Sequence, residues 1–372
     1  MKNIVGAGLS GLSAGINLAL SGESVKIIDR SNKIASKFPE SVHAFRNYST
    51  REDELTHIKS IGLNLTDLKP IHRIVKYGPS LNPGEMYSED KPLFYAVKRG
   101  NVKQGMDYQL HKQAEGLNIN FELGTKNINS QKIDIIATGA AFATEMGYGY
   151  HYKNVNVDEN TIIFLLNDKY APKGYAYAIP YGKHEISVVT TSFEPNTFNK
   201  MSLFYNKLLE EVDIFSKLIE GGERGETFGK IGFYHLPRTA ISKSSLITGE
   251  AAGFAEADRG FGMHYALESG ALASKSIIEN INYDELWKKS FEPELTKAFK
   301  RRLILNKIGN LEYDKLINAG TKMSNTEYIK YKDNESKNFL KQLFGNIYIN
   351  NQIRRIKKSF EIDKFYADKF NI

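Results

Sequence analysis

Cysteine is absent from this 372-residue chain. Its absence excludes disulfide bonds and the zinc or iron–sulfur sites that cysteine thiolates build. The eight histidines are scattered, with no pair at metal-ligand spacing and no repeated acidic companion, so we expect no metal site. A chain without cysteine also agrees with a reducing cytoplasm.

Long apolar runs are also lacking. No run approaches the ~20 residues that span a bilayer, and Met1 leads straight into a short strand pattern rather than a signal peptide. The net charge of +7, from 50 basic and 43 acidic residues, is mild for this length. No nucleic-acid motif accompanies it, so we expect no nucleic-acid partner. These features predict a cytoplasmic protein, either soluble or peripheral at a membrane.

Two late segments concentrate positive charge beside apolar residues. The basic residues are Lys297, Lys300, Arg301, Arg302 and Lys307, and then Arg354, Arg355, Lys357 and Lys358. One hypothesis is contact with an anionic membrane, where each basic residue contributes about 1 kcal/mol. The other, which we favour, is a solvated helix face.

A glycine-rich loop opens the chain. Residues 5–11 read Val-Gly-Ala-Gly-Leu-Ser-Gly between an apolar strand and a helix pattern. In such a loop Gly6 permits the tight turn, Gly8 leaves room for a pyrophosphate, and Gly11 lets the helix pack on the strand. Asp29 ends the next strand, about twenty residues on, where a carboxylate can accept hydrogen bonds from a ribose. The pattern predicts a dinucleotide site for NAD or FAD.

Two later stretches favour FAD. Residues 133–137 form a short apolar run typical of a buried parallel strand, and Ala-Thr-Gly at 137–139 supplies small residues for a close approach to a ligand. A third strand pattern at 245–248 precedes Gly249 and Glu250. A helix starting near Gly262 could point its N-terminus at a reduced, anionic flavin, which its dipole favours by ~0.3–1 kcal/mol.

The order of these motifs resembles the flavoprotein group that includes the aromatic hydroxylases, and most of all the geranylgeranyl reductase family. Residues 249–254, 260–263 and 266–273 are similar to that family's flavin-closing motif. Residues 174–182, Gly-Tyr-Ala-Tyr-Ala-Ile-Pro-Tyr-Gly, resemble its substrate-domain signature. The likeness covers roughly residues 1–280.

The chain departs from this family at three points. Glu250 stands where the family has aspartate, and Ala257 replaces a usual proline. The loop at residues 37–48 lacks the cysteine that reductases of this family carry near the flavin. The longer side chain of Glu250 displaces its carboxylate, which can alter or remove its bond to the ribityl chain.

Arg99 belongs to a segment that resembles the family's arginine-containing stretch near the flavin. Its guanidinium could donate to ribityl or pyrophosphate oxygens. A surface arginine in a basic cluster with Lys98 and Lys103 is an equally good interpretation.

The motifs and the resemblance together assign the candidate site. The cofactor-binding residues are Gly6, Ala7, Gly8, Ser10, Gly11, Asp29, Arg30, Arg99, Ala137, Thr138, Gly139, Gly249, Glu250, Gly260, Gly262 and Met263. The substrate pocket is assigned to Tyr175, Tyr177, Ile179 and Pro180, whose aromatic and aliphatic side chains suit a prenyl chain, although such residues usually form an ordinary sheet core. No catalytic residue is identified; His264, as a proton donor, and Arg259 are weak candidates.

The expected fold is α/β, with a Rossmann-type FAD-binding domain built on a three-layer parallel sheet. An antiparallel substrate domain is interleaved with it, and a helical region follows. The FAD-binding domain is assigned to residues 1–40, 90–145 and 240–285, the substrate domain to 41–89 and 146–239, and the C-terminal helical region to 286–372. Runs at 161–166, 175–180 and 186–191 predict an antiparallel meander. A single helix is expected to follow, with one apolar face made of Phe204, Leu208, Val212, Phe215 and Ile219.

The leading functional hypothesis is an FAD-dependent reductase of C=C double bonds in a prenyl lipid of the geranylgeranyl type. NAD(P)H, binding transiently, or a reduced carrier protein would supply electrons. An oxygen-using hydroxylase with NAD(P)H is the first alternative, which the missing cysteine affects less. A non-catalytic prenyl-binding protein, similar to Rab escort factors, is the second, and Glu250 is the feature that favours it.

Overall fold

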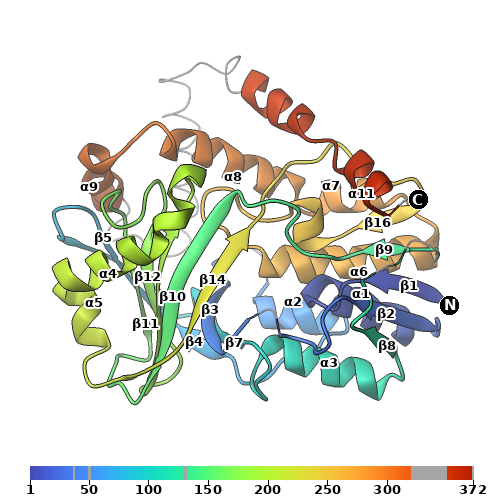
Figure 1. Ribbon diagram of the computed structural model, residues 1–372, viewed down its shortest axis with the longest axis horizontal. Helices are drawn as coiled ribbons and strands as arrows, with labels where there is room; N and C mark the ends of the chain where they lie inside the picture. The colour runs from blue at the N-terminus through green and yellow to red at the C-terminus, as the bar shows by residue number, and fades with distance from the viewer. Residues whose placement is uncertain (37, 49–51, 127, 129–131, 320–349, 371–372) are drawn as a thin grey trace.

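The computed structural model describes residues 1–36, 38–48, 52–126, 128, 132–319 and 350–370. It is a mixed α/β structure with two large sheets side by side, a small sheet between them and helices at the C-terminal end (Figure 1). This architecture confirms the expected fold class.

The parallel sheet carries the N-terminal glycine loop. Its strand order is β15–β16–β9–β1–β2–β8, and every pairing is parallel except β15 with β16. The strands are β1 (Lys2–Val5), β2 (Val25–Asp29), β8 (Asn120–Leu123), β9 (Ile135–Ile136), β15 (Ile241–Ser242) and β16 (Ser245–Ile247). The carboxyl ends of β1, β9 and β16 are therefore neighbours, which brings the three motif stretches to one edge of the sheet.

Helices α1 (Leu9–Leu20), α3 (Met106–Gly116) and α6 (Met263–Glu279) pack beside this sheet. Small residues let α1 and α6 lie in close contact. Ser13 Oγ donates to the carbonyl of Leu267 at 2.7 Å, and a side chain at Gly270 would meet the carbonyl of Ser10 at 2.3 Å. The second half of the flavin-closing motif is thus fixed directly against the helix of the glycine loop.

The second large sheet has the order β14–β10–β13–β12–β11–β5–β6. Its strands are β5 (Arg73–Tyr77), β6 (Pro83–Tyr87), β10 (Glu145–Lys153), β11 (Thr161–Leu165), β12 (Ala176–Pro180), β13 (Glu185–Ser192) and β14 (Glu223–Gly232). All pairings are antiparallel except β11 with β5. The predicted meander of β11, β12 and β13 is confirmed.

Helices α4 (Met201–Glu211) and α5 (Asp213–Leu218) cover one face of this sheet, following the 3₁₀ turn η1 (Pro195–Lys200). The single helix expected here is wrong in one respect, because the helix is interrupted at Val212. The β-branched Val212 takes an extended backbone, with φ −124° and ψ 89°, and its side chain is buried in the core.

A three-stranded antiparallel sheet packs against the opposite face. It consists of β3 (Ser41–Arg46), β4 (Lys69–Ile71) and β7 (Phe94–Arg99), in the order β3–β7–β4. Its Val42 and Phe94 share an apolar core with Ile162 and Ile179 of the large sheet. Helix α2 (Glu54–Ser60) instead packs on the core of the parallel sheet through Ile58.

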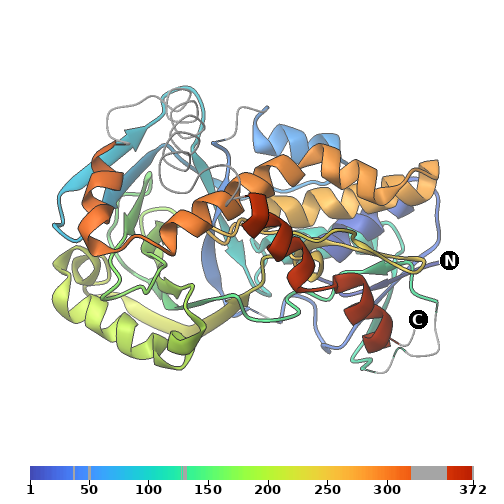
Figure 2. The same ribbon diagram turned by 90° about the horizontal axis from the view of Figure 1, so that it is seen from above.

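The helices α7 (Tyr283–Ser290), α8 (Glu292–Leu305), α9 (Asn310–Ala319) and α11 (Ile362–Phe370) follow, and residues 350–359 are also helical. Figure 2 shows α8 running from the parallel-sheet side toward the second sheet, while the C-terminal helices return over the parallel-sheet side. In the part of the chain that the structure describes, no helix is long and apolar enough to cross a membrane.

Three of the clustered basic residues do not form a free charged face. Arg301 Nε lies 2.5 Å from a carboxylate oxygen of Asp258, and Lys357 pairs with Glu292 at 2.6 Å. The Arg302 guanidinium is buried over the ring of Phe193. These three side chains are therefore engaged within the protein rather than on a solvated helix face, and contact of the other basic residues with a membrane stays a hypothesis.

Candidate flavin and substrate site

The three glycines of the N-terminal loop have three different environments. Gly6 has φ +109°, and a Cβ there would lie 2.2 Å from the carbonyl oxygen of Ala137. A Cβ at Gly11 would lie 1.9 Å from the carbonyl of Gly6, whereas a Cβ at Gly8 would meet nothing within 4 Å. Gly8 begins α1, whose first-turn amides favour an anion. The loop therefore fits a dinucleotide pyrophosphate at Gly8.

Asp29 joins the glycine loop to the second strand. One carboxylate oxygen accepts a hydrogen bond from the Ala7 amide at 2.7 Å, and the other accepts from the Ser31 amide at 2.7 Å. Each oxygen keeps a further lone pair that could accept from a ribose. Arg30 is exposed at the same strand end; burial and the Arg30 charge lower the pKa of Lys369 in α11.

The mid-chain stretch lies directly beside the glycine loop. The Ala137 amide donates to the carbonyl of Val5 at 2.7 Å, and Gly139 has φ +75°. The Thr138 hydroxyl donates to the hydroxyl of Tyr366 in α11 at 3.3 Å. The C-terminal helix thus contacts the predicted cofactor edge, a relationship that no sequence motif indicated.

The third stretch closes the same edge through the 3₁₀ turn η2 (Gly249–Ala252). A Cβ at Gly249 would lie 2.6 Å from Ser10 Oγ, so this contact between motifs requires glycine. One carboxylate oxygen of Glu250 accepts a hydrogen bond from the Phe233 amide at 3.2 Å. The longer side chain that replaces aspartate is therefore engaged with the chain beyond β14.

Arg99 is buried, so its interpretation as a surface residue is wrong. Its Nε and a terminal nitrogen donate to the two oxygens of Asp107 at 2.5 and 2.9 Å. The guanidinium also lies 4.6 Å from the ring centre of Phe38. Arg99 therefore fastens β7 to the first turn of α3, whether or not its remaining donor reaches a ligand.

A cavity lies where the second sheet, the small sheet and the turn before α6 meet. Aromatic and aliphatic side chains make most of its wall, and the turn contributes Arg259, Gly260, Phe261, Gly262 and Met263. Other lining residues include His43, Ala44, Glu145, Phe164, Tyr175, Tyr177, Ile179, Val189, Phe228 and Lys230. The structure thus places three of the four predicted pocket residues together, next to the flavin-closing motif.

Pro180 is the exception among those four residues. Tyr177 and Ile179 line the cavity, and side chains alternate between the two faces of a strand, so Pro180 falls on the opposite face. It is not a lining residue among those that the structure describes.

The two weak catalytic candidates have different environments. His264 is buried, and its Nδ1 is hydrogen-bonded to the carboxylate of Glu54 in α2; it does not line the cavity in the described part of the chain. Arg259 does line the cavity, its guanidinium donates to the Tyr48 hydroxyl, and its carbonyl accepts from Tyr175. Of the two, only Arg259 lies among the described residues that line the cavity.

Glu145 was missed by sequence reasoning. It begins β10, six residues after Gly139, and lies in no recognised motif. Burial raises the pKa of its carboxyl to about 7, with Lys230 opposing the shift. Only the tertiary structure, which packs the start of β10 against the turn at Gly260, places Glu145 in the cavity wall.

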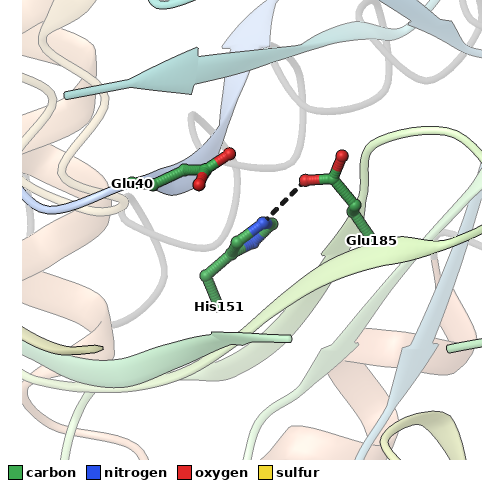
Figure 3. Close-up of side chains that lie close together, drawn as sticks. All are labelled: Glu40, His151 and Glu185. Atoms are coloured by element: carbon green, nitrogen blue, oxygen red, sulfur yellow. Dashed lines mark hydrogen bonds and ion pairs between the residues drawn. The ribbon is translucent and has the colours of Figure 1, made fainter. Parts of the chain in front are cut away.

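A second group of ionisable side chains lies outside this cavity. Glu40, His151 and Glu185 approach one another (Figure 3), with His151 Nε2 2.8 Å from Glu185. Lys98 contacts Glu40 at 2.8 Å and Glu185 at 2.7 Å, and Lys153 contacts Glu40 at 2.6 Å. Two ammonium groups neutralise the two carboxylates, so the cluster acts as an ion-pair network rather than as a cation site.

Sequence comparisons identify relatives over part of the chain. No protein-family model matches it. An uncharacterized protein of Methanocaldococcus jannaschii is 26% identical over 245 residues, covering 59% of this chain and 62% of that protein. The digeranylgeranylglycerophospholipid reductase 2 of Methanothermobacter thermautotrophicus is 26% identical over 183 residues, 46% of each chain. The match thus covers less than two thirds of the length of either relative.

Solved structures share the fold over nearly the whole chain. A geranylgeranyl bacteriochlorophyll reductase-like protein from Thermoplasma acidophilum superposes with a TM-score of 0.72 at 17% identity, covering 92% of this chain and 98% of that one. The flavin-dependent brominase Bmp2 gives a TM-score of 0.62 at 12% identity, covering 90% and 98%. The comparisons confirm the resemblance carried by the motifs: the chain is similar to the geranylgeranyl reductase family and has the fold of FAD-dependent oxidoreductases.

Proposed function

We propose that this protein is an FAD-dependent oxidoreductase that reduces C=C double bonds of a prenyl lipid. The observation that carries the proposal is the continuity between the turn at residues 259–263 and a cavity walled by aromatic and aliphatic side chains. Such walls suit an isoprenoid chain, whose burial contributes ~0.8 kcal/mol per methylene.

The residues at the sheet edge would hold FAD. Gly8 and the first turn of α1 would receive the pyrophosphate, Asp29 would accept from the ribose, and Gly260 to Met263 would border the flavin ring. When bound and reduced, FAD supplies a hydride; the chain orients the alkene and excludes water from it. NAD(P)H or a reduced carrier protein would return electrons, and contact with a membrane would deliver the lipid.

The test is hydrogenation by the whole protein. The protein is loaded with FAD, reduced chemically under argon and mixed with a geranylgeranyl glycerophospholipid, and the lipid is then analysed by mass spectrometry. We expect a gain of two hydrogens for each double bond reduced, together with reoxidation of the flavin. An unchanged lipid across several prenyl lengths contradicts the proposal.

The same preparation separates the two alternatives. Oxygen consumption with a hydroxylated product, in the presence of NAD(P)H, identifies an oxygen-using hydroxylase. A protein that binds the prenyl lipid but takes up no FAD identifies a non-catalytic carrier.

A further inference from the structure

We propose that Glu145 is the acid that gives the proton to the alkene while hydride arrives from the flavin side. This assignment rests on the proposed function and adds a catalytic residue to it. No motif and no resemblance pointed to Glu145; its position in the fold does.

The carboxyl group of Glu145 lies where the turn at residues 259–263, assigned to the flavin, meets the cavity assigned to the substrate. A Cβ built on Gly260 would lie 2.4 Å from each of its oxygens, and one built on Gly232 would lie 2.0 Å from Oε1. Two glycines therefore leave the room that this carboxyl occupies. It lines the cavity together with Gly260, Gly262, Met263 and Tyr177.

Glu145 is also chemically distinct within the cavity wall. It is the one carboxylic acid among the described lining residues, and its oxygens make no hydrogen bond or ion pair with any described residue. Tyr175, by contrast, donates its hydroxyl hydrogen to the carbonyl of Arg259. An acid without a structural partner is available to a substrate.

The other titratable groups of the wall are poorer donors at neutral pH. Burial lowers the pKa of His43 well below its usual value, with the charges of Arg99 and Lys230 acting in the same direction. Burial raises the pKa values of Tyr175 and Tyr177 above those of ordinary phenols. His43 is therefore unprotonated near pH 7, and the two phenols hold their protons too tightly.

Burial raises the pKa of Glu145 to about 7, so a large fraction of it carries a proton near neutral pH. The charged groups that face it come from several elements: Lys230 of β14 and Arg302 of α8 lower its pKa, Glu250 of η2 raises it, and Tyr175, Tyr177 and Tyr234 lie within its electrostatic reach. A general acid is most effective when its pKa lies near the working pH.

The proton of Glu145 completes the proposed reduction of the double bond. The π bond of the alkene breaks, one carbon receives hydride from reduced FAD, and the other receives the proton of the Glu145 carboxyl. Two C–H bonds form, the alkene is reduced, the flavin is oxidised and Glu145 is left as a carboxylate. Water entering the cavity after product release returns the proton.

The experiment compares wild-type protein with Glu145→Gln, which keeps the size of the side chain but has no acidic proton. Glu226→Gln, an exposed residue of the same sheet, is the matched control. Melting curves and FAD titration establish that each variant folds and binds the cofactor. We expect Glu145→Gln to slow oxidation of the reduced flavin by the prenyl lipid by about 100-fold or more at pH 7. Glu145→Asp, which keeps an acid, should retain part of the rate.

Two further measurements separate catalysis from structure. The single-turnover rate of the wild type should fall as pH rises above about 7, and Glu145→Gln should lack this dependence. Infrared spectra of the protein without lipid should show a protonated carboxyl band that disappears over the same pH range and is missing in Glu145→Gln. That band reports the state of the residue independently of activity.

The outcomes distinguish failure of the Glu145 assignment from failure of the proposed function. A wild-type protein that hydrogenates the lipid, with Glu145→Gln equally fast, overturns the assignment of Glu145 alone. Absence of the titrating band also overturns it. A wild type that binds FAD but hydrogenates no prenyl lipid overturns the proposed function, and this assignment with it.

Discussion

Arg99 and Asp107 form a buried two-point ion pair, with N–O distances of 2.5 and 2.9 Å, that ties the last residue of β7 to the first turn of α3. The planar guanidinium matches the two carboxylate oxygens in a way that a lysine cannot. The segment between them, residues 100–106, is thereby closed into a loop beside the small sheet.

Breaking this pair should strongly destabilise the protein. In Asp107→Asn the buried guanidinium loses its counter-charge, so we expect the free energy of unfolding to fall by about 3–5 kcal/mol. Urea denaturation followed by circular dichroism measures the change. The exposed pair of Arg73 and Glu85, at 2.7 Å, is the control: Arg73→Gln should cost no more than about 1 kcal/mol. Equal losses in the two variants would contradict the role given to Arg99.

Substitution of Gly8 should weaken FAD binding without destabilising the fold. A Cβ at this position meets no protein atom within 4 Å and the backbone has φ −83°, so Gly8→Ala should leave the melting temperature of the FAD-free protein unchanged or slightly raised. The added methyl would occupy the space assigned to the pyrophosphate, and we expect FAD affinity to fall by at least about ten-fold.

The control for Gly8 is Gly116, at the end of α3, where a Cβ is equally unobstructed. Gly116→Ala should leave FAD affinity unchanged. Isothermal titration and thermal melting measure both quantities on each variant. Undiminished FAD affinity in Gly8→Ala would exclude the glycine loop as the pyrophosphate site.

Glu185 should make stability depend on acid pH. Burial alone would raise its pKa, but hydrogen bonds from His151 and Lys98 lower it to about 2 from an ordinary 4.5. Because the pKa is lowered on folding, the ionised carboxylate stabilises the fold fully at pH values above the unfolded-state pKa. This stabilisation is lost as pH falls from about 4.5 toward 2. Glu185→Gln should therefore cost about 2 kcal/mol at pH 7 and much less at pH 3. A cost that does not change with pH would show that the network does not act through its charges.

Tyr177 tests the wall of the cavity. Tyr177→Ala removes an aromatic ring from the cavity wall. We expect the lost apolar contact with the lipid to cost about 1.4 kcal/mol, which corresponds to a ten-fold rise in KM for the prenyl lipid. FAD affinity should stay the same. Tyr87→Ala, on the exposed face of β6, should change neither quantity. A drop in FAD affinity with unaltered KM would move Tyr177 from the substrate wall to the cofactor site.

Much of the fold follows from local patterns that the structure confirms. The glycine loop with its flanking strand and helix, and the meander of β11, β12 and β13, appear where periodicity predicts them, because apolar alternation and turn residues act over short distances. The helix break at Val212 was not predicted, since the apolar spacing continues through it and only the extended backbone of Val212 in the structure shows the change.

The sequence by itself determined where the chain turns and which strands are buried. The spacing of its three small-residue stretches also indicated FAD as the cofactor expected at the sheet edge. Only the tertiary structure decided that Glu145 lies against Gly260, that Arg99 is buried against Asp107, and that Tyr366 reaches Thr138. Glycine turns depend on local backbone geometry. These three contacts depend on how separate strands and helices pack together, and no local pattern specifies that packing.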